Sequence, residues 1–191
     1  MRDEETGTMW SHILGKAMDG KLKGSELELL PGELVDWKSW KTRYPQTTVL
    51  NMSRTAKQFD VEMQKTPGKF VLGIHRIGKA AKAYPYEKLQ VEQVVNDKIG
   101  DEALVVFFDP VSTAATVHSR VVDGRTLSFE QASPGKIKDA ETGSLWDAHS
   151  GRCVAGDLQG KELRAMVGVP SFRKAWFRFF PESEEYGKKS R

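Results

Sequence analysis

The chain contains one unit of about 43 residues twice, and this duplication constrains its fold more than any other feature. Shifting the sequence by 136 positions aligns residues 3–45 with residues 139–181 without a gap, and 15 of the 43 aligned positions are identical. Ordinary residue frequencies would give about 3 identities. The identities fall mainly on glycine, tryptophan and proline, as in Gly15/Gly151, Trp10/Trp146, Trp40/Trp176 and Pro45/Pro181. Few residues meet the geometric demands of these three, so both copies are expected to fold alike.

Each copy predicts the same succession of a turn, short strands and a helix. The motif Asp-x-Glu-Thr-Gly opens both copies and is typical of a tight turn, followed by a short strand that ends in Trp10 or Trp146. A glycine-punctuated segment then leads to a second predicted strand, at residues 27–30 and 162–166. Aromatic side chains at helical spacing predict a closing helix in each copy, and Pro45 and Pro181 are expected to end these helices.

Outside the repeated unit, the pattern predicts more strands. Residues 70–75 and 104–108 are short apolar runs rich in strand-forming residues. The runs 117–122 and 125–130 flank Asp123-Gly124, a dipeptide typical of a two-residue hairpin turn. We therefore predict an α+β protein that is mostly β, with short antiparallel strands and hairpins and a closing aromatic helix in each of two repeated units.

The two copies are unequal in length. About 70 residues, 69–138, precede the shared unit in the second copy, whereas only Met1 and Arg2 precede it in the first. We therefore expect the first copy to be a truncated repeat. The predicted organisation is the C-terminal part of a first repeat at 1–50, a linker at 51–68, a near-complete second repeat at 69–183 and a charged tail at 184–191.

The charge and the cysteine content argue against several classes of function. The formal net charge of +3 comes entirely from Lys188, Lys189 and Arg191, and the remaining 26 basic residues balance the 26 acidic ones. A balanced body gives little of the phosphate neutralisation that nucleic-acid binding needs, so no nucleic-acid partner is expected. No stretch approaches about 18 apolar residues, so no membrane span is expected. Cys153 is the only cysteine, which excludes an intrachain disulfide or a thiolate metal cluster.

Several motifs together give the chain a family resemblance. They are DEETGTMW, LELLP, GKAAKAYP, VVND, DGRTLSF and DAETGSLW, at residues 3, 27, 78, 94, 123 and 139. With these motifs the chain resembles the bacterial domain-of-unknown-function family 3179. The resemblance covers about 69–183 as a nearly complete domain and about 3–50 as the closing part of a preceding copy. It implies an exported or periplasmic location, although this chain shows no signal peptide after Met1.

The chain departs from this family at a position that bears on chemistry. The resemblance implies Cys-Pro-Leu-Cys-Gly after the central strand, a spacing suited to a metal or a redox thiol pair. Here the matching residues are Asp109, Pro110, Val111, Ser112 and Thr113. A carboxylate and a hydroxyl replace the two thiols, so any thiol function of the family does not carry over to these positions.

Five side chains are candidates for a binding or reactive site. If the strands at 104–108 and 117–122 pair, His118 is expected near Asp109 and Ser112, but no G-x-S-x-G motif supports a hydrolase triad. Asp139 and Glu141 stand at alternate positions, as Ca²⁺ ligands often do. Two carboxylates, however, supply fewer than the six to eight oxygen ligands that Ca²⁺ takes. We therefore interpret Asp139 and Glu141 as shaping a turn.

The sequence thus favours a non-catalytic binding or scaffold module whose surface between the copies meets a protein or small ligand. No cofactor and no metal site are expected, and no partner is specified. The alternative is the inert remainder of a metal- or thiol-dependent exported protein whose Cys-x-x-Cys would lie in a missing N-terminal half.

Overall fold

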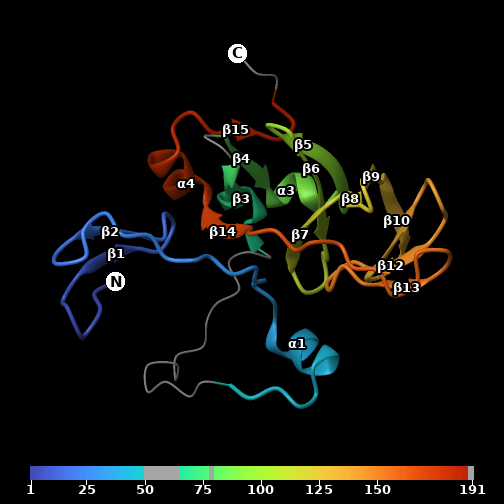
Figure 1. Ribbon diagram of the computed structural model, residues 1–191, viewed down its shortest axis with the longest axis horizontal. Helices are drawn as coiled ribbons and strands as arrows, with labels where there is room; N and C mark the ends of the chain where they lie inside the picture. The colour runs from blue at the N-terminus through green and yellow to red at the C-terminus, as the bar shows by residue number, and fades with distance from the viewer. Residues whose placement is uncertain (50–64, 78–79, 189–191) are drawn as a thin grey trace.

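The computed structural model describes residues 1–49, 65–77 and 80–188. The protein is built from small, mostly antiparallel sheets with a few short helices (Figure 1). The prediction of an α+β, mostly β fold is therefore confirmed. Most of the predicted linker, 51–68, lies outside the described residues, and its end forms the short 3-10 helix η1, Pro67–Lys69.

The first unit is a hairpin followed by a helix. Strands β1 (Met9–Ser11) and β2 (Lys16–Asp19) pair antiparallel, and α1 (Trp37–Arg43) follows. The Asp36 side chain begins α1 by accepting a hydrogen bond from the Ser39 amide at 3.0 Å, and Pro45 follows the C-cap residue. The closing helix ends where the sequence predicts.

The second unit repeats this arrangement inside a larger domain. Strands β12 (Leu145–Asp147) and β13 (Cys153–Ala155) match β1 and β2, and α4 (Arg173–Phe179) matches α1. Backbone geometry repeats as well: φ is 103° at Gly20 and 99° at Gly156. A sheet in the order β10-β11-β12-β13 extends this unit, with β10 at Phe129–Ser133 and β11 at Lys136–Asp139.

The second strand predicted in each copy is wrong in position. Residues 27–30 and 162–166 form no strand, and the paired strands β2 and β13 come instead from the glycine-punctuated segments. Leu163 donates its amide to the Gly151 carbonyl at 2.9 Å, whereas Met166 donates to Val117 at 2.9 Å. Residues 162–166 thus bond to two different neighbours in turn, and Leu163 and Met166 are buried although the segment forms no continuous strand ladder.

The centre of the domain is a three-stranded antiparallel sheet in the order β5-β6-β7. Its strands are β5 (Val94–Ile99), β6 (Glu102–Phe108) and β7 (Ala115–Ser119). Alternate β6 residues enter two different cores, with Leu104 and Phe108 in one and Val105 and Phe107 in the other. The apolar run at 104–108 therefore reflects a strand buried on both faces.

A second four-stranded sheet covers one of these cores. Its order is β14-β3-β4-β15, with bounds Val169–Phe172, Phe70–Ile77, Ala80–Pro85 and Glu184–Glu185. The short helix α3 (Tyr86–Leu89) follows β4. β15 pairs in parallel with β4, so the first residues of the predicted charged tail belong to this sheet.

The predicted hairpin at Asp123-Gly124 is present but short. β8 (Val121–Val122) and β9 (Arg125–Thr126) pair antiparallel across it, with φ of 49° at Asp123 and 76° at Gly124. Positive φ at both central residues is the geometry that the dipeptide predicts.

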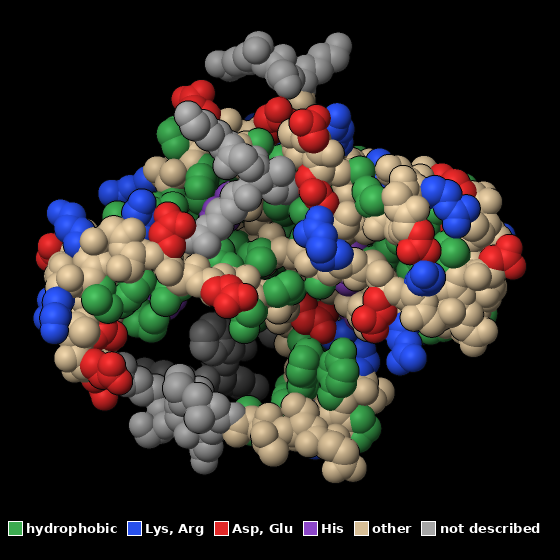
Figure 2. Space-filling model, viewed as in Figure 1, with side chains coloured by type: hydrophobic (Ala, Val, Ile, Leu, Met, Phe, Trp, Pro, Cys, Tyr) green, Lys and Arg blue, Asp and Glu red, His purple; other side chains and the backbone are tan. Residues whose placement is uncertain are grey.

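The equivalent tryptophans of the two units differ in burial. Trp146 and Trp176 are fully buried, whereas Trp10 and Trp40 are only half-buried. Figure 2 shows hydrophobic side chains at the surface over the β1–β2 hairpin and α1. The difference arises because strands from residues 70–138 cover the second unit, and the described residues place no equivalent strands on the first.

Candidate functional site

Asp139 organises the turn that opens the second unit. Its carboxylate accepts hydrogen bonds from the Thr142 amide at 2.6 Å, the Thr142 hydroxyl at 2.8 Å and the Trp146 indole N–H at 2.8 Å. Asp3 makes the same three bonds in the first unit, at 2.6, 2.8 and 2.9 Å. Both carboxylates therefore hold a turn and anchor an indole ring.

Glu141 does not join Asp139 at a common site. Its carboxylate is exposed and accepts a hydrogen bond from the Ser128 amide at 2.9 Å, across the sheet edge. Within the described ranges, no three side chains of His, Cys, Asp or Glu lie together so as to hold a metal ion. The contacts of Asp139 are those of a turn-forming residue, whereas the bond of Glu141 reaches outside its own turn.

Replacing Asp139 with asparagine is expected to make stability less dependent on pH in acid. Burial alone would raise the pKa of Asp139, but hydrogen bonds from Trp146 and Thr142 outweigh it and hold the pKa below its ordinary value. The stabilisation is therefore present above the unfolded-state pKa of about 3.9 and is lost as pH falls through the lower folded pKa.

Urea unfolding at a series of pH values between neutrality and about pH 2 would measure this effect. Asp139→Asn should be less stable than the wild type at neutral pH, and the gap should narrow in acid. Glu141→Gln changes an exposed carboxylate and is the matched control. Its free energy of unfolding should depend on pH as that of the wild type does. If the difference in free energy of unfolding between Asp139→Asn and the wild type stayed the same at every pH, the stabilising role of the Asp139 carboxylate would be contradicted.

Asp109 and Ser112 lie together in the loop between β6 and β7. The buried Ser112 hydroxyl donates to the Asp109 carboxylate at 2.5 Å, and the Val111 amide donates to the same carboxylate at 2.9 Å. Thr113 takes a φ of 57° in this loop. Asp109 and Ser112 thus close a tight turn.

His118 lies further along β7, opposite Val105. It lies three positions beyond Ala115 along the strand, about 10 Å at the usual rise per residue. Its Nε2 lies 3.2 Å from the Ala148 carbonyl, and burial lowers the pKa of the imidazole. The structure therefore places His118 against the second unit, apart from the Asp109–Ser112 turn.

A groove between the two units passes over His118. The first unit contributes the segment 31–33 with Trp40 and Tyr44. Strand β7 contributes Thr116, Val117 and His118, and the second unit contributes His149, Ala165 and Met166. The hollow measures about 190 Å³. Side chains of both units and of β7 surround this space.

A polar contact holds the groove together at one end. Glu33 lies 3.3 Å from Nδ1 of His149 and 2.7 Å from the Arg43 guanidinium. Burial alone would raise the pKa of Glu33, but these hydrogen bonds outweigh it and hold the pKa below the ordinary value. The carboxylate is thus charged at neutral pH and connects α1 to the second unit.

Sequence patterns missed Glu33 and His149, which are 116 residues apart. One signal was available: in the aligned repeats Glu33 matches Val169, and His149 matches Ile13. Ile13 itself packs against the apolar cluster around Trp176 in the second unit. At both of these positions a difference in polarity between the copies marks a contact between the units.

The fold is α+β and mostly β, and it is built from two related units. A groove is shared between these units. The family model described as "Protein of unknown function (DUF3179)" matches residues 1–62 and 55–183. The chain belongs to this family. Comparison with curated proteins and with solved structures finds no match. No helix of the described part is long and apolar enough to cross a membrane.

Proposed function

We propose that this protein is a non-catalytic binding or scaffold module whose groove between the two units receives a partner. The observation that carries the proposal is the composition of the groove. Trp40 and Tyr44 of the first unit, Thr116 of β7 and Met166 of the second unit line a single hollow. A space shared by two units is a common location for a binding site.

The size of the groove indicates what it would hold. A hollow of about 190 Å³ is smaller than the ~300 Å³ at which sites for drug-sized ligands begin. A cavity of about 150 Å³ accommodates a benzene ring. We therefore expect the groove to take one ring-sized apolar group, either a small molecule or a side chain of a protein partner.

The contacts of the candidate residues support a non-catalytic role. The Ser112 hydroxyl is buried and donates to Asp109, while His118 sits elsewhere against Ala148. A nucleophile needs a base within hydrogen-bond reach and access to its substrate. Ser112 has a carboxylate in reach but no exposed surface.

Amide NMR titration with indole tests the groove. Indole should shift the signals of residues 116–118 and 165–166 with a Kd of about 1 mM or tighter. Trp40→Ala should abolish these shifts. Trp37→Ala is the matched control on the same helix, because Trp37 is 52% exposed and does not line the hollow, and it should bind like the wild type.

Two results would contradict the proposal. One is the absence of indole-induced shifts in the groove of the wild-type protein. The other is turnover of generic ester, phosphate or disulfide substrates that Asp109→Ala abolishes, since that would make the Asp109–Ser112 turn catalytic.

A further inference from the structure

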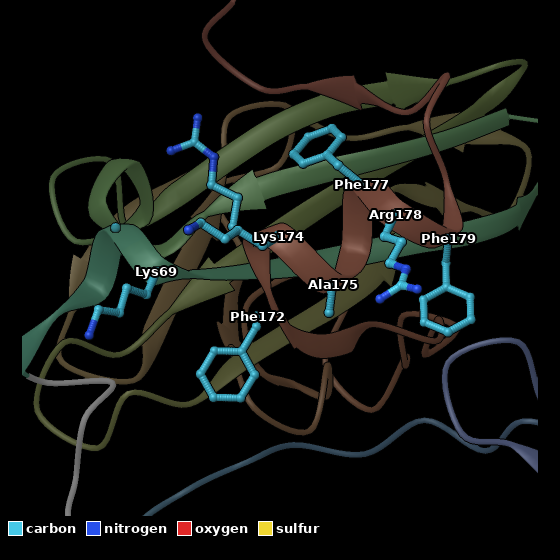
Figure 3. Close-up of a pocket in the computed structure, with 9 residues that line it drawn as sticks. Lys69, Phe172, Lys174, Ala175, Phe177, Arg178 and Phe179 are labelled. Atoms are coloured by element: carbon cyan, nitrogen blue, oxygen red, sulfur yellow. The ribbon is translucent and has the colours of Figure 1, made fainter.

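An exposed apolar stripe runs from the end of β14 along the outer face of α4. Phe172, Ala175 and Phe179 follow the i, i+3, i+7 spacing of one helix face, and the two phenylalanines are 54% and 43% exposed. Figure 3 shows all three on one side of the helix, with Phe177 on the other. Trp176, between them in sequence, is the residue that buries the helix against the sheet.

The stripe borders a broad hollow with an unbalanced positive charge. The hollow measures about 1300 Å³, and its lining includes Lys69, Lys174 and Arg178 but no acidic side chain. Arg173, on the same helix, is neutralised by Glu185 at 3.1 and 2.5 Å. Lys69, Lys174 and Arg178 form no such pair with any residue that the structure describes.

Comparison of the two units shows that packing within the unit does not require this face. Trp176 and Lys174 have identical counterparts in α1, Trp40 and Lys38. The stripe has none: Asp36, Ser39 and Arg43 stand where α4 has Phe172, Ala175 and Phe179. Phe172 packs on Phe70 with ring centroids 4.8 Å apart, yet more than half of its side chain stays exposed, as does much of Phe179. Exposed aromatic side chains grouped on one face are the usual mark of an interaction surface.

We propose that this face of α4 is a docking surface for an acidic amphipathic helix of a partner protein. Apolar side chains of the partner would lie against Phe172 and Phe179, as in other helix-in-groove complexes. Its carboxylates would pair with Lys174 and Arg178 on the rim. The hollow exceeds the ~1000 Å³ upper range of small-ligand sites, and its concave shape suits a helix better than a flat membrane surface. The proposal is independent of the groove at Trp40.

Fluorescence anisotropy with the full chain tests this surface. The probe is a labelled synthetic helix of about five turns, with leucines at i and i+4 flanked by glutamates. We expect saturable binding that weakens as salt is raised. The same peptide with lysine in place of every glutamate should not bind.

Charge reversal gives the sharpest variant. Lys174→Glu with Arg178→Glu should weaken binding of the acidic peptide at least tenfold, about 1.4 kcal/mol, and create binding of the lysine peptide. Both side chains are exposed, so the melting temperature should stay that of the wild type. Lys38→Glu, at the equivalent position on α1, is the matched control and should leave the affinity unchanged.

Two outcomes overturn the proposal. The first is absent binding of the acidic peptide, or binding that the double charge reversal leaves unchanged. The second is sedimentation of the wild type with phosphatidylserine-containing vesicles in the absence of peptide binding, which would assign this face to an anionic membrane.

Discussion

Replacing Trp146 with alanine is expected to lower the free energy of unfolding by about 3 to 5 kcal/mol. The ring is fully buried, lies edge-on to Phe129 at 5.9 Å and donates its N–H to Asp139 at 2.8 Å. Alanine would leave a cavity in the second unit and remove one hydrogen bond from a buried carboxylate. Urea unfolding followed by circular dichroism measures the change.

The repeat itself supplies the control. Trp10 makes the same hydrogen bond to Asp3, at 2.9 Å, but its ring is only half-buried. Trp10→Ala should therefore cost about 1 to 2 kcal/mol, since less apolar surface is lost from the core. Equal costs at the two positions would show that the covering strands contribute nothing to the environment of Trp146.

Replacing Gly73 with alanine is expected to destabilise the protein by about 1 to 3 kcal/mol or more. A Cβ atom at Gly73 would lie 2.1 to 2.4 Å from three ring atoms of Trp176, and that ring is fully buried. The indole would have to move away from β3, which would disturb its 2.9 Å hydrogen bond to the Ser183 hydroxyl. Urea unfolding and a shift in tryptophan fluorescence report both changes.

Two further variants separate the steric clash from a general effect of alanine. Gly32→Ala should change stability by less than about 0.5 kcal/mol, because nothing lies within 4 Å of the added atom. In a Trp176→Leu background, Gly73→Ala should cost much less, because the ring that it displaces is gone. If the Gly73→Ala protein had the same melting temperature as the wild type, the close packing of α4 on β3 would be contradicted.

The strongest local signals in the sequence correspond to features confirmed in the structure. The helix spacing around Trp40 and Trp176 and the prolines behind them predict α1 and α4, and the apolar run at 104–108 predicts β6. These signals work because each depends on contacts a few residues apart. The strand predicted at 162–166 fails because its bonds go to two distant neighbours, at Gly151 and Val117.

The candidate site was less predictable. The residue pattern predicted His118 near Asp109 and Ser112, not in the groove that it lines. It could not identify Glu33 and His149, because their contact joins two units across 116 residues. Asp109 and Ser112 do lie together, as adjacent turn residues would. Their distance from His118 depends on strand register, which no local pattern specifies.

By itself the sequence determined that two copies of one unit exist, that each carries an Asp-Thr-Trp turn and a closing helix, and that the chain belongs with its family. These features depend on backbone geometry at glycine and on hydrogen bonds within seven residues, as between Asp139 and Trp146. Only the tertiary structure decided which copy has a buried core and which faces remain open. Burial depends on the strands that cover a unit. Strands of residues 70–138 bury Trp146 and Trp176 of the second unit, whereas Trp10 and Trp40 of the first stay half-buried.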